Sequence, residues 1–365
     1  MKIKDIINVL ENFAPPSLQE AYDNAGLITG NRETACTGIL CTLDATEAVV
    51  EEAIKNNCNM VVAHHPVVFK GLKSITGRNY VERTIIKAIK HDIAIYAIHT
   101  NLDNILAGVN GKMADLLGLT DRRVLLPKKN ALRKLFTYVP SGHAEELRKA
   151  IWDAGAGDIG NYSECSFNTS GKGTFRGGAD TDPFVGKRGE LHTEEEIKVE
   201  IIFPYWLQGR VISALVATHP YEEPAYDIVA LDNTFDRVGS GLTGTLPHPV
   251  DEKTFLAQLK NVFGLSVIRH TVLTGRPIKT VSLCGGAGSF LITNALRAGS
   301  DVYITADMKY HEFFDAGEQM IIADIGHYES EQFTIDLIYD ILREKFPTFA
   351  LLKTAVNTNP VFYYA

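Results

Sequence analysis

Histidines and carboxylates follow three short apolar segments of this 365-residue chain. Each segment, residues 60–63, 93–98 and 320–324, has the composition of a buried strand. The side chains that follow are His64, His65, His99, Asp103, His327 and Glu331. In open α/β sheets, ligands bind beyond the carboxyl ends of the strands, so we expect these groups to meet.

Five of these side chains form the predicted metal-ligand set: His64, His65, Asp103, His327 and Glu331. Five nitrogen and oxygen donors exceed what one tetrahedral ion needs, and they suffice for two divalent ions. His327 and Glu331 are i and i+4, so they share a face if they open a helix. A carboxylate so placed can bridge two cations about 3.5–4 Å apart. The alternative is a capping Ser330 beside a surface glutamate.

The adjacent residues His64 and His65 can both bind metal in one pocket only if their side chains point to the same side. Successive side chains of a regular strand point to opposite faces, but this constraint lifts at a strand end. Pro66 holds His65 in an extended or turn conformation, so the two imidazoles can face two neighbouring ions. The alternative is a pair of ordinary loop histidines.

His99, Asp307 and His311 are the candidates for catalytic proton transfer. His99 stands four residues before Asp103, while Asp307 and His311 follow a further predicted strand, residues 301–305. A helix cap and an exposed histidine are the alternative interpretation of the last two. The glycine-rich loop 284–289 could present amides to a phosphate or only form a tight turn.

The elements that must position these groups change in kind along the chain. Up to about residue 120, strands alternate with helices, which indicates a parallel α/β layout. Residues 131–233 follow the order β-α-β-β-α-β of a ferredoxin-like unit, with a hairpin predicted across residues 170–172. We therefore predict a discontinuous α/β domain, residues 1–130 and 234–365, whose halves rebuild one sheet around an inserted α+β domain.

Bulk composition excludes several classes of protein. The net charge of −8 gives no expectation of non-specific nucleic-acid binding. The five cysteines lack CxxC spacing and indicate reduced thiols in a cytoplasmic protein. No segment approaches the roughly 18 apolar residues of a membrane span, and the N-terminus does not read as a signal peptide.

These motifs together resemble the GTP cyclohydrolase I type 2 family, the Nif-like dinuclear metal-centre hexamers also called Ngg-interacting factor three-like. The motifs that carry the resemblance are residues 23–27, His64-His65-Pro66, residues 99–103, 108–110, 285–289, 301–305, Tyr310-His311 and residues 326–331. Residues 160–163 and 219–223 resemble the PII/CutA-like insert of the longer members. Ala306 departs from the family, where many members have glycine.

The resemblance implies two divalent ions per subunit, with His64 and Asp103 on one, His65 and His327 on the other, and Glu331 bridging. Nitrogen and oxygen donors suit Zn, Mn, Fe or Ni better than Mg or Ca. It also implies a homohexamer whose metal sites face an internal cavity.

The expected function is metal-dependent hydrolysis, in which activated water attacks a small-molecule substrate, a nucleotide or phosphoester, or a purine-ring carbon. The alternative is a non-enzymatic metal-dependent scaffold or regulator, with the insert as a sensor or partner-binding module.

Overall fold

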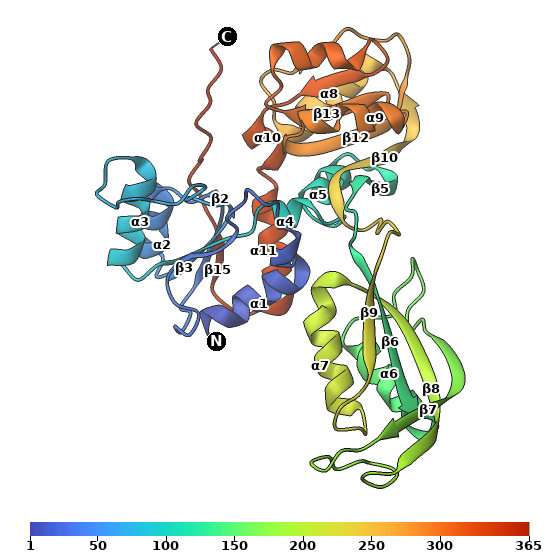
Figure 1. The fold of residues 1–365 in the computed structure, drawn as a ribbon. Helices are drawn as coiled ribbons and strands as arrows, with labels where there is room; N and C mark the ends of the chain where they lie inside the picture. The colour runs from blue at the N-terminus through green and yellow to red at the C-terminus, as the bar shows by residue number, and fades with distance from the viewer. Residues whose placement is uncertain (365) are drawn as a thin grey trace. The chain divides into compact units, whose positions relative to one another are not determined.

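The computed structural model describes residues 1–364, and its mixed α/β chain divides into two compact units (Figure 1). Met1–Pro127 and the residues from Asp236 onward form the split unit, and Lys128–Phe235 form the insert. The insert begins three residues before the predicted boundary at 131 and ends two residues after 233. No helix within residues 1–364 is long and apolar enough to cross a membrane.

The first sheet of the split unit has four parallel strands and one antiparallel edge strand. Its order is β1 (Gly26–Thr29), β4 (Ala94–Ala97), β3 (Met60–His65), β2 (Ile39–Asp44) and β15 (Leu351–Lys353), with β1 antiparallel. Parallel pairing places the carboxyl ends of β2, β3 and β4 at one edge.

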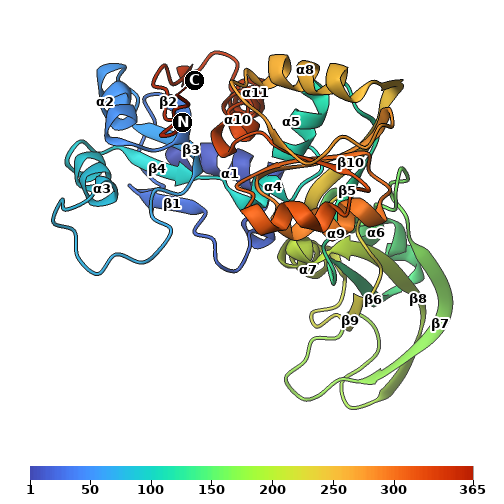
Figure 2. The same cartoon turned by 90° about the horizontal axis from the view of Figure 1, so that it is seen from above.

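Helices cover both faces of this sheet (Figures 1 and 2). On one face, α1 (Ile3–Phe13) and α11 (Thr334–Lys345) pack on alternate strand residues; on the other pack α2 (Glu47–Lys55) and α3 (Tyr80–Lys90). The inner strands β2, β3 and β4 are buried on both sides, which explains their continuous apolar sequences.

The second sheet of the split unit is separate from the first. Its order is β11 (Arg269–His270), β14 (Ile321–Asp324), β13 (Val302–Ala306), β12 (Ile278–Ala287), β10 (Gly239–Val250) and β5 (Thr120–Pro127), and the adjacent strands β12, β13 and β14 are parallel. Its core includes α5 (Val109–Leu116) and α8 (Glu252–Phe263) on one face and α9 (Ile292–Arg297) on the other.

The prediction that the two flanking halves rebuild one sheet was therefore wrong. Each sheet has helices on both of its faces, so each buries its own apolar core.

Short 3-10 helices occur at η1 (Pro16–Leu18), η2 (Ser141–His143), η3 (Tyr205–Leu207), η4 (Ser289–Leu291) and η5 (Tyr310–Ala316).

The insert is a four-stranded antiparallel sheet with two helices on one face. Along the chain its elements are β6 (Leu132–Pro140), α6 (Ala144–Asp153), β7 (Phe167–Arg176), β8 (Leu191–Pro204), α7 (Gln208–Thr218) and β9 (Tyr226–Leu231), in the sheet order β7-β8-β6-β9. The hairpin predicted across residues 170–172 was wrong, because these residues lie within β7 and pair with β8. Pairing with a long neighbouring strand overrides the local turn signal of Ser-Gly-Lys.

Candidate metal centre

Polar side chains stand at three neighbouring strand ends of the first sheet. Asp44 ends β2, His65 ends β3, and His99 follows β4 as the N-cap residue of α4 (Thr100–Asp103). Because these strands are parallel neighbours, the sheet brings these side chains to one edge.

The second sheet contributes donors from its own parallel strands. Asp307 follows β13 with φ +56°, and α10 (His327–Glu331) begins three residues after β14 ends. The φ of Asp307 is in the left-handed region, so the chain turns at the residue directly after β13.

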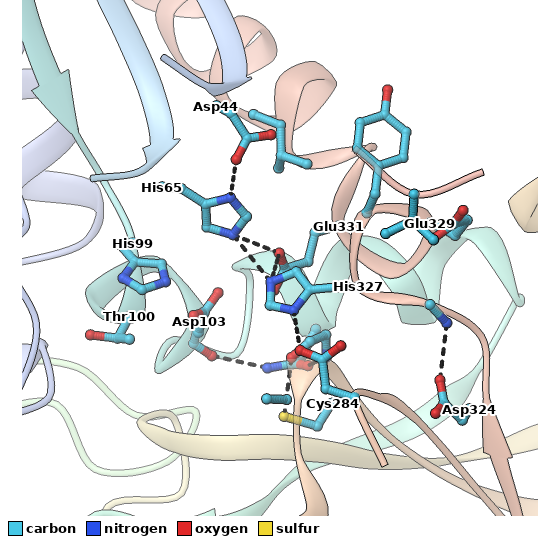
Figure 3. A pocket seen from close by; sticks show the side chains of 18 of the residues that line it. Asp44, His65, His99, Thr100, Asp103, Cys284, Asp324, His327, Glu329 and Glu331 are labelled. Atoms are coloured by element: carbon cyan, nitrogen blue, oxygen red, sulfur yellow. Dashed lines mark hydrogen bonds and ion pairs between the residues drawn. The ribbon is translucent and has the colours of Figure 1, made fainter. Parts of the chain in front are cut away.

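The structure brings all five predicted ligands together. Figure 3 shows His65, Asp103, His327 and Glu331 around this centre. His64 Nε2 lies 3.6 Å from Asp103 Oδ1 and 4.0 Å from Glu331 Oε1. The other oxygen, Glu331 Oε2, lies 2.9 Å from His65 Nε2 and 3.1 Å from His327 Nε2. Glu331 Oε2 thus faces His65 and His327, while Oε1 lies toward His64.

A glycine allows the Glu331 carboxylate to occupy this position. Gly286 has φ +62°, and a Cβ on it would lie only 2.4 Å from Glu331 Oε1. Any larger residue at 286 would displace the carboxylate from the centre.

Within residues 1–364, two buried atoms of the centre have no hydrogen-bond partner: His64 Nε2 and Asp103 Oδ1. His64 is fully buried, and an unsatisfied buried polar atom costs about 1–3 kcal/mol. A neutral imidazole nitrogen and a carboxylate oxygen are both metal ligands, so the donor set fits a divalent cation.

Each of three imidazoles is held through its Nδ1 atom, which leaves Nε2 toward the centre. His64 Nδ1 bonds to the carbonyl oxygen of Ile98 at 2.9 Å. His65 Nδ1 bonds to Asp44 at 2.8 Å, and His327 Nδ1 bonds to Asp307 at 2.7 Å. Such partners fix the tautomer and ring orientation of metal-binding histidines.

His99 shares this arrangement, although the sequence suggested only proton transfer for it. Its Nδ1 lies 2.7 Å from Asp23 Oδ1, and one ligand atom from each of His64, His65 and His99 lies within 4.8 Å of the others. His99 can therefore act on protons or bind an ion. His311 is not brought in: it is exposed on η5, packs against Tyr310 and Phe314, and does not line the site cavity.

The charges of these groups differ strongly. Burial lowers the pKa of His64 to about 3, so its imidazole is neutral. Burial alone would lower the pKa of His65, but hydrogen bonds to Asp44 and Glu331 outweigh it and raise the pKa to about 9. Burial and the Glu331 charge raise the pKa of Asp103. For Glu331, burial opposes ionisation, but hydrogen bonds with imidazoles hold its pKa well below the usual range. A cation would compete with the proton of His65 for its Nε2 atom.

The centre opens into a cavity of about 690 Å³. Aromatic side chains at its wall are Tyr22, Phe69, Phe290, Tyr328 and Tyr363. The one lysine or arginine among the lining residues is Arg269, which already bonds to Asp324 at 3.0 Å and to the carbonyl oxygen of Met308. Side chains of the lining therefore offer little free positive charge to an anionic ligand.

Comparison with known proteins identifies the family. The family model described as Duf34/NIF3 (NGG1p interacting factor 3) matches residues 1–360. The chain belongs to the Duf34/NIF3 family. The resemblance predicted from the motifs is thereby confirmed.

Relatives in the Duf34/NIF3 family match nearly the whole chain. A "GTP cyclohydrolase 1 type 2 homolog" of Halalkalibacterium halodurans is 39% identical over 360 residues, 97% of each chain. One of Bacillus subtilis is 38% identical over 327 residues, covering 89% of this chain and 88% of the relative. The crystal structure of a Bacillus cereus protein related to NIF3 matches with TM-score 0.87 and 36% identity, over 100% of this chain and 99% of that one.

Sequence reasoning missed two carboxylates of this Duf34/NIF3 site, Asp23 and Asp44. Asp44 ends a strand at the edge that carries His64 and His65, yet it was not among the predicted site residues. Asp23 lies in a matched motif, but its contact with His99 spans 76 residues of chain and has no local signal.

The glycine-rich loop offers little to a phosphate. The amide of Gly285 donates to Asn110 Oδ1, and the amide of Gly286 donates to Ser330 Oγ, both at 3.0 Å. The loop thus supports the centre by tying α5 and α10 to β12.

Proposed function

We propose that the split unit binds two divalent cations at this centre and uses them to hydrolyse a nucleotide or another phosphoester. In this proposal His64 and Asp103 bind one ion, His65 and His327 bind the other, and Glu331 bridges them. The observation that carries the proposal is the pair of unpartnered buried atoms, His64 Nε2 and Asp103 Oδ1, 3.6 Å apart. A cation bound by both atoms removes the cost of leaving them unsatisfied.

Imidazole and carboxylate ligands together favour Zn, Mn, Fe or Ni. When bound, two such ions would supply Lewis acidity toward water and positive charge toward an anionic substrate. The chain's own contribution is to fix the ligands, with Asp44 and Asp307 each holding one imidazole in place. The aromatic wall suits a ring-bearing substrate, since aromatic side chains stack on bases.

Proton transfer is assigned to His99. Its Nδ1 is hydrogen-bonded to Asp23. Burial alone would raise the pKa of the Asp23 carboxyl, but hydrogen bonds from His99 and Thr100 outweigh burial and lower this pKa to about 2. The ionised partner leaves His99 Nε2 to accept or return a proton at the cavity. Asp307, bonded to His327, acts in this proposal by positioning that ligand.

The family relation extends the proposal to the assembly and to the insert. We assign a homohexamer with the metal sites toward an internal cavity, and a ferredoxin-like, PII/CutA-like fold for residues 131–233. The order β-α-β-β-α-β and the sheet order β7-β8-β6-β9 support the second assignment.

The experiment is turnover by the full chain loaded separately with Zn, Mn, Fe or Ni, on a panel of nucleotides and phosphoesters. Asp103→Ala should abolish turnover, whereas Asp115→Ala, which removes an exposed carboxylate paired with Arg122, should keep it. Metal binding without turnover on any compound would overturn the hydrolase assignment and favour a metal-dependent regulator.

A further inference from the structure

The insert contains a cavity of about 620 Å³ that is independent of the metal centre. Its wall is formed by β7, by Glu196 and Lys198 of β8, and by residues of the segments 177–184 and 221–225. This volume suits a small organic molecule.

Two glycines of β7 leave space for this cavity. Gly171 and Gly173 are alternate residues of β7, so they lie on the same face of the sheet and leave it without side chains there. A Cβ on Gly173 would lie 2.0 Å from Glu196 Oε2, so only glycine leaves room for that carboxylate. Glycines inside a strand commonly mark a place where another group approaches closely.

Glu196 is the buried charge of the cavity. It is 8% exposed, and its Oε1 accepts a hydrogen bond of 2.9 Å from the neutral hydroxyl of Tyr221. Among residues 1–364, no lysine or arginine forms an ion pair with Glu196. A buried carboxylate without a cationic partner is costly, and a bound cation would compensate it.

The basic side chains of the cavity wall bond to groups other than Glu196. Lys198 Nζ bonds to Glu200 at 2.9 Å, Lys172 pairs with Glu195 at 3.1 Å, and Arg176 donates to the carbonyl oxygen of Gly189 at 2.6 Å. None of them neutralises Glu196.

Aromatic rings surround the same space. The Tyr221 ring centroid lies 6.0 Å from that of Phe175 and 6.3 Å from that of Phe184, and Tyr138 completes the aromatic lining. Aromatic faces attract organic cations through the ring quadrupole, and a set of such rings with a carboxylate recognises ammonium groups.

A bare metal ion fits this lining poorly. The nearby His219 has both ring nitrogens occupied, Nε2 by the carbonyl oxygen of Tyr138 at 2.9 Å and Nδ1 by the amide of Tyr221 at 3.1 Å. Glu222 and Glu223 also line the cavity, but both are exposed, and Glu222 Oε1 already accepts a hydrogen bond from the amide of Asp182 at 3.0 Å. Within residues 1–364, the insert has no group of three His, Cys, Asp or Glu side chains close enough together to hold a divalent ion.

We propose that the insert binds a small organic ammonium ion in this cavity, with its charge against Glu196 and its alkyl groups against Phe175, Phe184 and Tyr221. The ligand class is that of choline and other methylated amines. This proposal does not depend on the metal centre.

The experiment is calorimetric titration of the full chain with choline and with 3,3-dimethylbutan-1-ol, its neutral analogue of nearly the same shape. Choline should bind about 10-fold or more tightly than the neutral analogue. Equal affinities, or no choline binding at millimolar concentration, would overturn the proposal.

Variants locate the site. Glu196→Gln keeps the size of the side chain and should weaken choline about 10-fold or more. Glu145→Gln is the control, because Glu145 is exposed in the first turn of α6 and does not line the cavity; this variant should bind choline as the unaltered chain does. Phe184→Ala removes a ring that is 52% exposed, so folding should be kept while choline binding weakens several-fold. Choline affinity unchanged in both Glu196→Gln and Phe184→Ala would place the ammonium elsewhere and overturn the assignment.

Discussion

The substitution Glu331→Gln tests the bridging role of this carboxylate. Glu331 is 3% exposed, with Oε1 4.0 Å from Nε2 of His64 and Oε2 2.9 Å from Nε2 of His65. Because Oε2 faces His65 and His327 while Oε1 lies toward His64, glutamine removes the charge from both proposed ion sites at once while keeping the shape of the side chain.

The magnitude follows from the charge that is removed. Two unit charges 4 Å apart interact by about 4 kcal/mol at an effective dielectric constant of 20. Since about 1.4 kcal/mol corresponds to a tenfold change in a binding constant, each ion should bind roughly 10²–10³-fold more weakly. His65→Ala, in contrast, should weaken mainly one ion.

The assay is a competition titration with a chromophoric chelator, which resolves the affinities of the two ions. Glu329→Gln is the matched control on the same helix, because Glu329 accepts a hydrogen bond from Asn359 at 3.0 Å instead of lying between the imidazoles. Loss of only one ion in Glu331→Gln, or equal losses in the two variants, would refute the bridging assignment.

Three further perturbations follow from the structure. Asp307→Asn should lower the affinity of the ion on His327 by about 10–100-fold with little effect on unfolding, measured by the same titration; unchanged affinity would contradict a positioning role. Burial lowers the pKa of His219 below its ordinary 6.5, so the unfolded chain takes up the proton first and stability falls as pH drops below 6.5. His219→Gln should flatten that fall in urea unfolding at several pH values, and an unchanged slope would refute this cause. Replacing residues 128–235 with a short turn should leave a folded, metal-binding chain, as judged by circular dichroism and metal content; a soluble but metal-free product would show that the insert is needed for the site.

Local signals in the sequence predicted many elements well. The strand predicted at residues 301–305 is observed as Val302–Ala306. Among the helices, Glu252–Phe263 begins at Asp251, which caps it by accepting hydrogen bonds from the amides of Lys253 and Thr254. The apolar segments 60–63 and 320–324 are observed within or as the strands Met60–His65 and Ile321–Asp324. Apolar runs and capping residues act over a few positions, so the sequence alone carries this information.

Long-range pairing was harder to predict. Ser170, Gly171 and Lys172 have turn composition, yet they extend along β8, and the glycines leave space beside Glu196. Likewise, no local signal in the sequence shows whether the strands of the split unit form one sheet or two. That outcome depends on which helices cover which strands.

The candidate site was predictable only in part. Strand ends carry polar residues to one edge, so the ligand candidates could be chosen from residue type and position. The contacts of Asp23 with His99 and of Asp44 with His65 join distant segments, and these carboxylates were therefore missed as orienting groups. The location of His311 away from the cavity was also beyond local reasoning.

The most direct test of the account is the metal content of the protein. The chain should be reconstituted with zinc or manganese, freed of loosely bound ions, and measured by elemental analysis against protein concentration. The account predicts two ions per chain, and fewer in Asp103→Ala, which removes the unpartnered Oδ1 beside His64. One ion or none per unaltered chain would contradict the two-cation centre.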